Sequence, residues 1–178
     1  QLVVAWLAWC TVCLPAAAAT VPSAVGGILD LREWNFDKDG PVAITGEVEF
    51  FWGRHLTSRE VPIATAEGGL DYTTVPASWN EHVHLGEQIG SYGTATYRVN
   101  LLVSDRRPVA LKLPELGTAY RLLIDGDAAL EVGQPGPVKA KTIPRYAPAF
   151  LQFTPKQQRV ELLFQVSNFH HRLGGLGL

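Results

Sequence analysis

The sequence predicts an all-β fold, an antiparallel sandwich of roughly nine strands. Two observations indicate it. Short runs of alternating apolar and polar residues recur along the chain, and no segment keeps a helical period. Residues 119–133 also read as a tight hairpin, in which Tyr120, Leu122 and Ile124 share one strand face. The Asp125-Gly126 pair that follows supplies the positive backbone angles of a primed two-residue turn.

The other elements follow from the same period of two. Residues 28–36 open the fold, and residues 44–52 alternate between an apolar and a more polar face. Residues 53–71 have no sustained period and predict a long loop, with one helical turn near 56–60. The remaining expected strands are 72–75, 94–103, 109–113, 119–124, 130–132, 138–143, 147–153 and 160–166.

The N-terminal stretch predicts a partial secretory signal peptide over residues 1–19. Residues 2–14 are almost entirely apolar, four alanines follow Pro15, and the first charged residue is Asp30. A retained membrane anchor stays open as an alternative. Cys10 and Cys13 are the only cysteines and lie inside this run, so we interpret them as apolar residues of the signal rather than as a redox or metal pair.

Composition limits the classes of partner. The formal net charge is −2 and no basic stripe occurs, which argues against nucleic-acid binding. Residues 20–172 are long enough to bury a core without disulfides, so we expect one domain there. The glycine-rich residues 173–178 are expected to begin a flexible linker.

Several motifs together resemble a known family. They are residues 29–36 (LDLREWNF), 45–52 (TGEVEFFW), 75–79 (VPASW), 93–98 (GTATYR), 119–126 (AYRLLIDG) and 167–175 (SNFHHRLGG). In order and spacing they resemble the extracytoplasmic, galactose-binding-like jelly-roll domain of bacterial seven-transmembrane receptors with diverse intracellular signalling modules. The resemblance implies a sensor outside the inner membrane, in the periplasm, joined to its own downstream transmembrane helices. A histidine kinase or a nucleotide cyclase, such as a diguanylate cyclase, would be the output.

The candidate ligand-binding residues are aromatic, planar polar or basic, the types that contact sugar rings and hydroxyl groups. An arginine would equally hold a carboxylate. The candidates are Trp79, Asn80, Arg98, Tyr120, Asn168, His170, His171 and Arg172. Structural roles stay open for them: Trp79 capping the core, Asn168 closing the last strand, and Arg172 pairing with Asp30 or Glu33.

Metal and catalytic signals are weak. His82 and His84, with Glu81 and Glu87 nearby, could offer ligands to a zinc ion, and His170 or His171 could join them if the loops meet. Adjacent histidines on a strand point in opposite directions, so only one of that pair could serve, and we favour ordinary loop histidines. The turn at residues 37–40 (DKDG) lacks the remaining carboxylates of a calcium loop, although a structural calcium ion there stays open. No paired-carboxylate, nucleophile-elbow or phosphate-loop pattern occurs. We therefore expect no enzyme activity, no catalytic residues and no cofactor.

The functional expectation is a ligand-sensing domain of a membrane receptor that binds a carbohydrate or a small carboxylate. One alternative is an accessory carbohydrate-binding domain of a secreted glycosidase. Another is a structural or adhesion β-sandwich. A homodimer stays open.

Overall fold

A computed structural model describes residues 20–177, and it confirms the all-β prediction. The main sheet has the strand order β3-β2-β6-β11-β8-β9, with antiparallel pairing throughout that path. The short strand β1 (Ile28–Asp30) pairs in parallel with one end of β6. The other strands of this sheet are β2 (Gly46–Trp52), β3 (Asp71–Val75), β6 (Gly93–Leu102), β8 (Ala119–Ile124), β9 (Asp127–Val132) and β11 (Arg159–Asn168).

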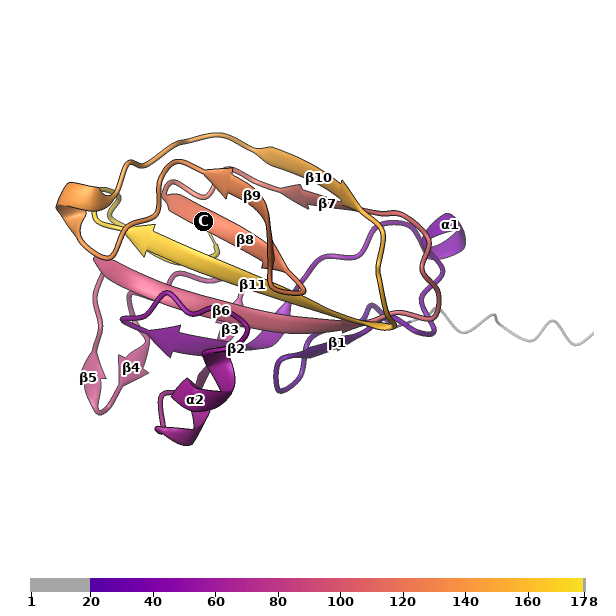
Figure 1. Ribbon diagram of the computed structural model, residues 1–178, viewed down its shortest axis with the longest axis horizontal. Coiled ribbons are helices and arrows are strands. Elements are labelled where there is room, and N and C mark those ends of the chain that lie inside the picture. Colours follow the sequence, from indigo (N-terminus) through magenta and orange to yellow (C-terminus); the bar gives the residue numbers. More distant parts are fainter. Residues whose placement is uncertain (1–19, 178) are drawn as a thin grey trace, which may run out of the picture.

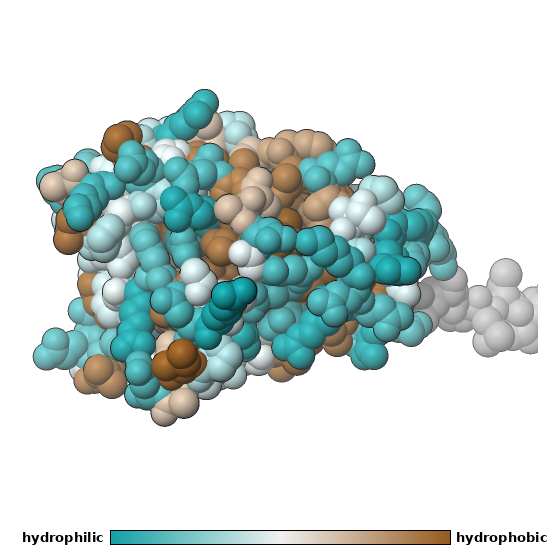
Figure 2. Space-filling model, in the orientation of Figure 1, coloured by the Kyte–Doolittle hydropathy of each residue, from teal (hydrophilic) through white to brown (hydrophobic). Residues whose placement is uncertain are grey.

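The second layer is an antiparallel pair, β7 (Val109–Leu113) and β10 (Ala149–Phe153). Figure 1 shows this pair running beside β9. Inward side chains of the main sheet, including the fully buried Tyr120 and Leu122, pack against Leu113 and Leu151 to form the main core. Hydrophobic residues also gather on the surface over β9 and β10 (Figure 2).

The outer face of the main sheet has a smaller core of its own. Helix α2 (Val61–Ala66) covers Phe51, Leu123 and Leu163, which sit at outward strand positions. The predicted loop thus contains a helix, but it begins after the expected 56–60, because Pro62 occupies a first-turn position that proline favours. Helix α2 thereby buries part of the outer face, and other outward positions of the same face carry polar residues such as Asn100 and Gln165.

The hairpin prediction is confirmed in its turn and its faces. Asp125 and Gly126 have φ angles of 50° and 85°, the signs that a primed turn requires. Strand β9 begins at Asp127, earlier than predicted, and a register shift between Leu122 and Leu123 accommodates the extra residues.

Two other segments differ from the prediction. The strand expected at 138–143 is wrong: a 3-10 helix, Lys139–Lys141, forms there instead. Thr142 Oγ1 stabilises it by donating to the carbonyls of Gly136 and Val138, both at 3.0 Å. A small hairpin of β4 (Val83–His84) and β5 (Glu87–Gln88) occupies the predicted loop before β6.

The structure describes the C-terminal end of the chain further than the N-terminal end. The predicted signal segment, residues 1–19, lies outside the described residues. In the described part, residues 20–177, no helix is long and apolar enough to cross a membrane. Residues 173–177, expected to start a linker, instead dock on the domain through a bridge between Gly175 and Ser78.

Candidate functional site

The two segments with most of the predicted ligand-binding residues meet at one end of the sandwich. Trp79 donates its backbone N–H to the carbonyl of Gly174 at 2.9 Å. The Asn80 side chain spans the same junction: its Nδ2 donates to the Arg172 carbonyl at 2.8 Å, and its Oδ1 accepts the Gly174 N–H at 3.0 Å. We call this junction of residues 76–92 with 168–177 the tail latch.

Asn168, the last residue of β11, joins the two segments of the tail latch through its side-chain amide. Its Nδ2 donates to the carbonyls of Ser91 (2.9 Å), His171 (2.8 Å) and Leu173 (3.2 Å). Its Oδ1 accepts the backbone N–H groups of His171 (3.0 Å) and His170 (3.4 Å). The side chain is 1% exposed, so its amide is fully engaged by protein groups.

Trp79 completes the latch as part of the core. Its side chain is 1% exposed and lies edge-on to Trp52 with the ring centroids 5.1 Å apart. The indole N–H donates to the Ser91 carbonyl at 3.1 Å. The indole rests directly on Gly174, where an added Cβ would come within 2.2 Å of Nε1. This contact explains the need for glycine at position 174.

Of the other predicted residues, His170, His171 and Arg172 contact the latch through backbone or ring atoms, whereas Tyr120 and Arg98 lie elsewhere in the sheet. His171 Nδ1 contacts the backbone of Leu173, while His170 and Arg172 are exposed. Tyr120 is fully buried, and its hydroxyl has no partner among residues 20–177. Arg98 lies on the outer face of the main sheet. The structure therefore joins Trp79, Asn80, Asn168 and His171 in one network of contacts.

Two of the histidines considered as metal ligands share a carboxylate instead. His82 Nε2 lies 2.9 Å from Asp71 Oδ2, and His84 Nδ1 lies 3.8 Å from the same oxygen. Burial opposes ionisation of Asp71, but the Tyr72 N–H and the two imidazoles together lower its pKa. Residues 20–177 contain no group of three or more histidine, cysteine or acidic side chains arranged to hold a metal ion.

A hollow of about 480 Å³ opens at the opposite end of the sandwich, beside the end of β6 and the α1 loop. We call it the end pocket. Its wall is mostly apolar: Leu31, Trp34, Phe36, Pro41, Val42, Val103, Pro108, Val109 and Ala110. Trp34 and Phe36 are half-buried and so keep part of their ring surfaces accessible, and the Trp34 N–H is satisfied by the Gly40 carbonyl at 3.0 Å. This volume falls within the size range of small-molecule sites.

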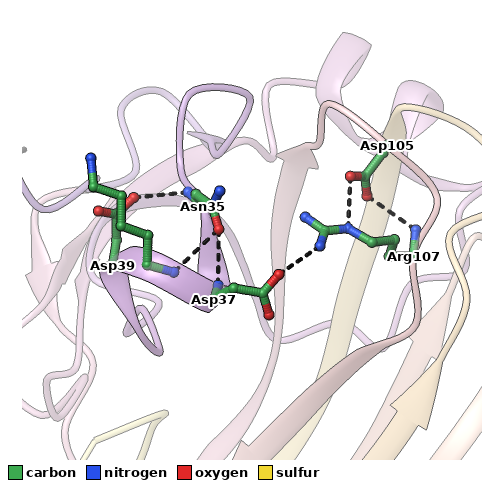
Figure 3. Close-up of polar contacts among 6 residues, drawn as sticks. Asn35, Asp37, Asp39, Asp105 and Arg107 are labelled. Atoms are coloured by element: carbon green, nitrogen blue, oxygen red, sulfur yellow. Dashed lines mark hydrogen bonds and ion pairs between the residues drawn. The ribbon is translucent and has the colours of Figure 1, made fainter.

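Charged side chains gather at the mouth of the end pocket (Figure 3). The Arg107 guanidinium donates to Asp37 Oδ2 at 2.9 Å and to Asp105 Oδ2 at 2.8 Å, and so bridges two loops that are far apart in sequence. These hydrogen bonds raise the pKa of Arg107. The backbone N–H of Arg107, and then its guanidinium, lower the pKa of Asp105. The mouth thus places the Arg107 guanidinium between the carboxylates of Asp37 and Asp105.

The short helix α1 (Phe36–Asp39) holds Phe36 and Asp37 at this mouth. Asn35 caps it, accepting the N–H groups of Asp37 and Lys38, and Asp39 Oδ2 accepts the Asn35 N–H at 2.9 Å (Figure 3). The carboxylates of the turn considered for calcium thus have protein partners, an N–H group and a guanidinium.

The sequence analysis chose no ligand-binding candidate from this pocket, because Trp34 and Phe36 read as apolar residues of the opening segment 28–36, and both do pack partly against the main core. The available signal was their placement beside a polar turn, residues 37–40.

Comparison with known proteins defines the fold. Over 71% of its length the chain is similar to part of a β-glucuronidase from Faecalibacterium prausnitzii, with a TM-score of 0.52 and 15% identity. A β-glucuronidase from an uncultured Clostridium sp. gives a TM-score of 0.50 and 14% identity over 72% of the chain. The chain shares their β-sandwich fold. It spans only 20% and 22% of those two proteins. No family model and no curated protein matches the chain.

Proposed function

We propose that this chain is a non-catalytic ligand-binding β-sandwich domain whose end pocket takes a saccharide. The observation that carries this is the combination of accessible aromatic surface, Trp34 and Phe36, with the fixed ionic cluster centred on Arg107. Sugars present a C–H face that packs on aromatic rings and a rim of hydroxyl groups that bind charged and planar polar groups.

The geometry of the mouth suits hydroxyl groups in particular. Each hydroxyl can donate one hydrogen bond and accept up to two, and the mouth offers carboxylates as acceptors beside a guanidinium as donor. Hydrogen bonds to Asp37 and Asp105 orient the Arg107 guanidinium at the mouth before a ligand arrives. A prearranged site loses less conformational entropy when it binds.

Two kinds of host protein are proposed for this domain. The fold similarity to part of two β-glucuronidases favours an accessory domain of a secreted glycosidase. The motif resemblance, above all residues 167–175, favours the extracytoplasmic sensor of a membrane receptor with a kinase or cyclase output. The sequence that follows residue 178 in the gene separates them: seven apolar spans fit the receptor, and a (β/α)8 pattern fits the glycosidase.

Isothermal titration calorimetry with neutral mono- and disaccharides tests the binding proposal. We expect at least one to bind, and we expect Phe36→Ala and Arg107→Gln each to weaken it about tenfold, the loss that about 1.4 kcal/mol of contact energy gives. Arg106→Gln is the matched control, because Arg106 is the exposed neighbour of Arg107 and lies outside the pocket wall. The proposal would be refuted if no saccharide bound at about 10 mM, because a dissociation constant above that concentration is too weak for a useful site.

A further inference from the structure

A second concave feature lies on the outer face of the main sheet, beside the part covered by α2. It encloses about 330 Å³ and is lined only by polar residues: Ser58, Arg98, Asn100, Asp125, Gln157, Arg159 and Glu161. We call it the sheet groove. Its strands β6 and β11 are the central pair of the sheet, so its floor is rigid.

Three carboxylates at or beside the sheet groove contact neighbouring groups. Arg98 Nη2 donates to Glu49 Oε1 at 2.8 Å, and Arg98 also forms ion pairs with Glu49 and, at 3.6 Å, with Glu161 Oε1. Glu161 also accepts the Ser58 hydroxyl, and Asp125 Oδ1 accepts the Glu161 N–H at 2.9 Å. These bonds fix the carboxylates and offset the charge of Arg98.

Some hydrogen-bond donors of the sheet groove lack partners among residues 20–177. Asn100 is 3% exposed, yet its Nδ2 is buried with no hydrogen-bond partner among residues 20–177. Its Oδ1 accepts Arg159 Nε at 3.0 Å, and Arg159 is otherwise exposed to solvent. Leaving a buried amide N–H unpaired costs about 1–3 kcal/mol, so an acceptor supplied from outside would recover that loss.

We propose that the sheet groove is a second binding site, which takes the carboxylate of a hydroxylated organic acid of sugar size. The carboxylate accepts hydrogen bonds from Asn100 Nδ2 and from the free end of the Arg159 guanidinium, a planar fork that matches its two oxygens. Hydroxyl groups of the same ligand donate to the second oxygen of Asp125 and bind Gln157. This site is separate from the end pocket and does not depend on it.

The probes are D-glucuronate and D-galacturonate, with D-glucose and D-galactose as matched neutral sugars that lack the carboxylate. Titration of the purified chain is followed by calorimetry and by the NMR signal of the Arg159 Nε–H group. We expect both acids to shift that signal and to bind at least about tenfold more tightly at this site than the neutral sugars, because charge-assisted hydrogen bonds are roughly twice as strong as neutral ones.

Three variants locate the binding. Arg159→Gln removes the exposed guanidinium, and Asn100→Asp replaces the unpaired donor by an acceptor; each is expected to weaken uronate binding about tenfold or more. Arg145→Gln makes the same charge change at an exposed position outside the groove and should leave binding unchanged.

Three results would overturn the proposal. The first is that neither acid binds, and the second is that Arg159→Gln binds the acids as tightly as the unchanged chain does. The third is that uronate binding disappears in Arg107→Gln, because the acids would then occupy the end pocket. Loss of neutral-saccharide binding in Arg107→Gln, with uronate binding intact, supports two separate sites.

Discussion

Replacing Asn168 by alanine is the most direct test of the tail latch. The side chain has two N–H hydrogens shared among three carbonyls, and one oxygen that accepts two N–H groups, so it makes up to four full hydrogen bonds. Each is worth about 1 kcal/mol net, and the longest of them, 3.4 Å to His170, is worth less. We expect Asn168→Ala to lower the free energy of unfolding by about 3 kcal/mol.

The assay is equilibrium unfolding in urea, followed by tryptophan fluorescence. Trp79, one of the five tryptophans of the chain, lies inside the latch and contributes to this signal; its indole donates to the same Ser91 carbonyl that Asn168 binds. Gln152→Ala is the control, since Gln152 is an exposed amide on β10, and it should change stability by less than about 0.5 kcal/mol. A loss below about 1 kcal/mol in Asn168→Ala would refute the reasoning, since water would then be replacing these bonds without cost.

Three other substitutions test separate parts of the structure. Tyr120→Phe should raise the unfolding free energy in urea by about 1 kcal/mol, because it removes a buried hydroxyl without a partner, whose burial also raises the phenol pKa to about 12. Gly174→Ala should be strongly destabilising, measured as a fall in Tm, because its Cβ would overlap the Trp79 ring. His55→Gln tests a pH effect. Burial lowers the pKa of His55 below its usual value near 6.5, so the unfolded chain takes up the proton first. Stability should therefore fall as pH drops from about 7 to 5, and the variant should flatten this fall; an unchanged slope would contradict the assignment.

The sheet could be predicted from sequence because its signals are local. Tyr120, Leu122 and Ile124 alternate with polar neighbours, and Asp125-Gly126 fits one turn type, so the faces and the turn of the hairpin follow directly. Alternation also predicted that Phe51 would face away from the main core, but not that α2 would bury it. The burial of Phe51 depends on where residues 53–71, which have no sustained period, pack against the sheet.

The sites were harder to predict because side-chain partners are not local. Asn80 and Asn168 are residue types that bind sugars, yet the structure engages both with backbone groups, one of them 94 positions away. Trp34 is an apolar residue that packs partly against the main core, and it also lines the end pocket together with the distant loop that carries Arg107. Residue type therefore identified Asn80 and Asn168 as polar candidates, but the tertiary arrangement determines which groups they bind.

The tail latch has a mechanical consequence. A pulling force applied at residue 177 does not act first on β11, because residues 174 and 175 are fastened to residues 78–80. These few bonds would break before the ten-residue pairing of β11 with β6 carries load. The latch would therefore open before the sheet is disrupted. Until it opens, it transmits tension on the tail to the segment that connects β3 with β6.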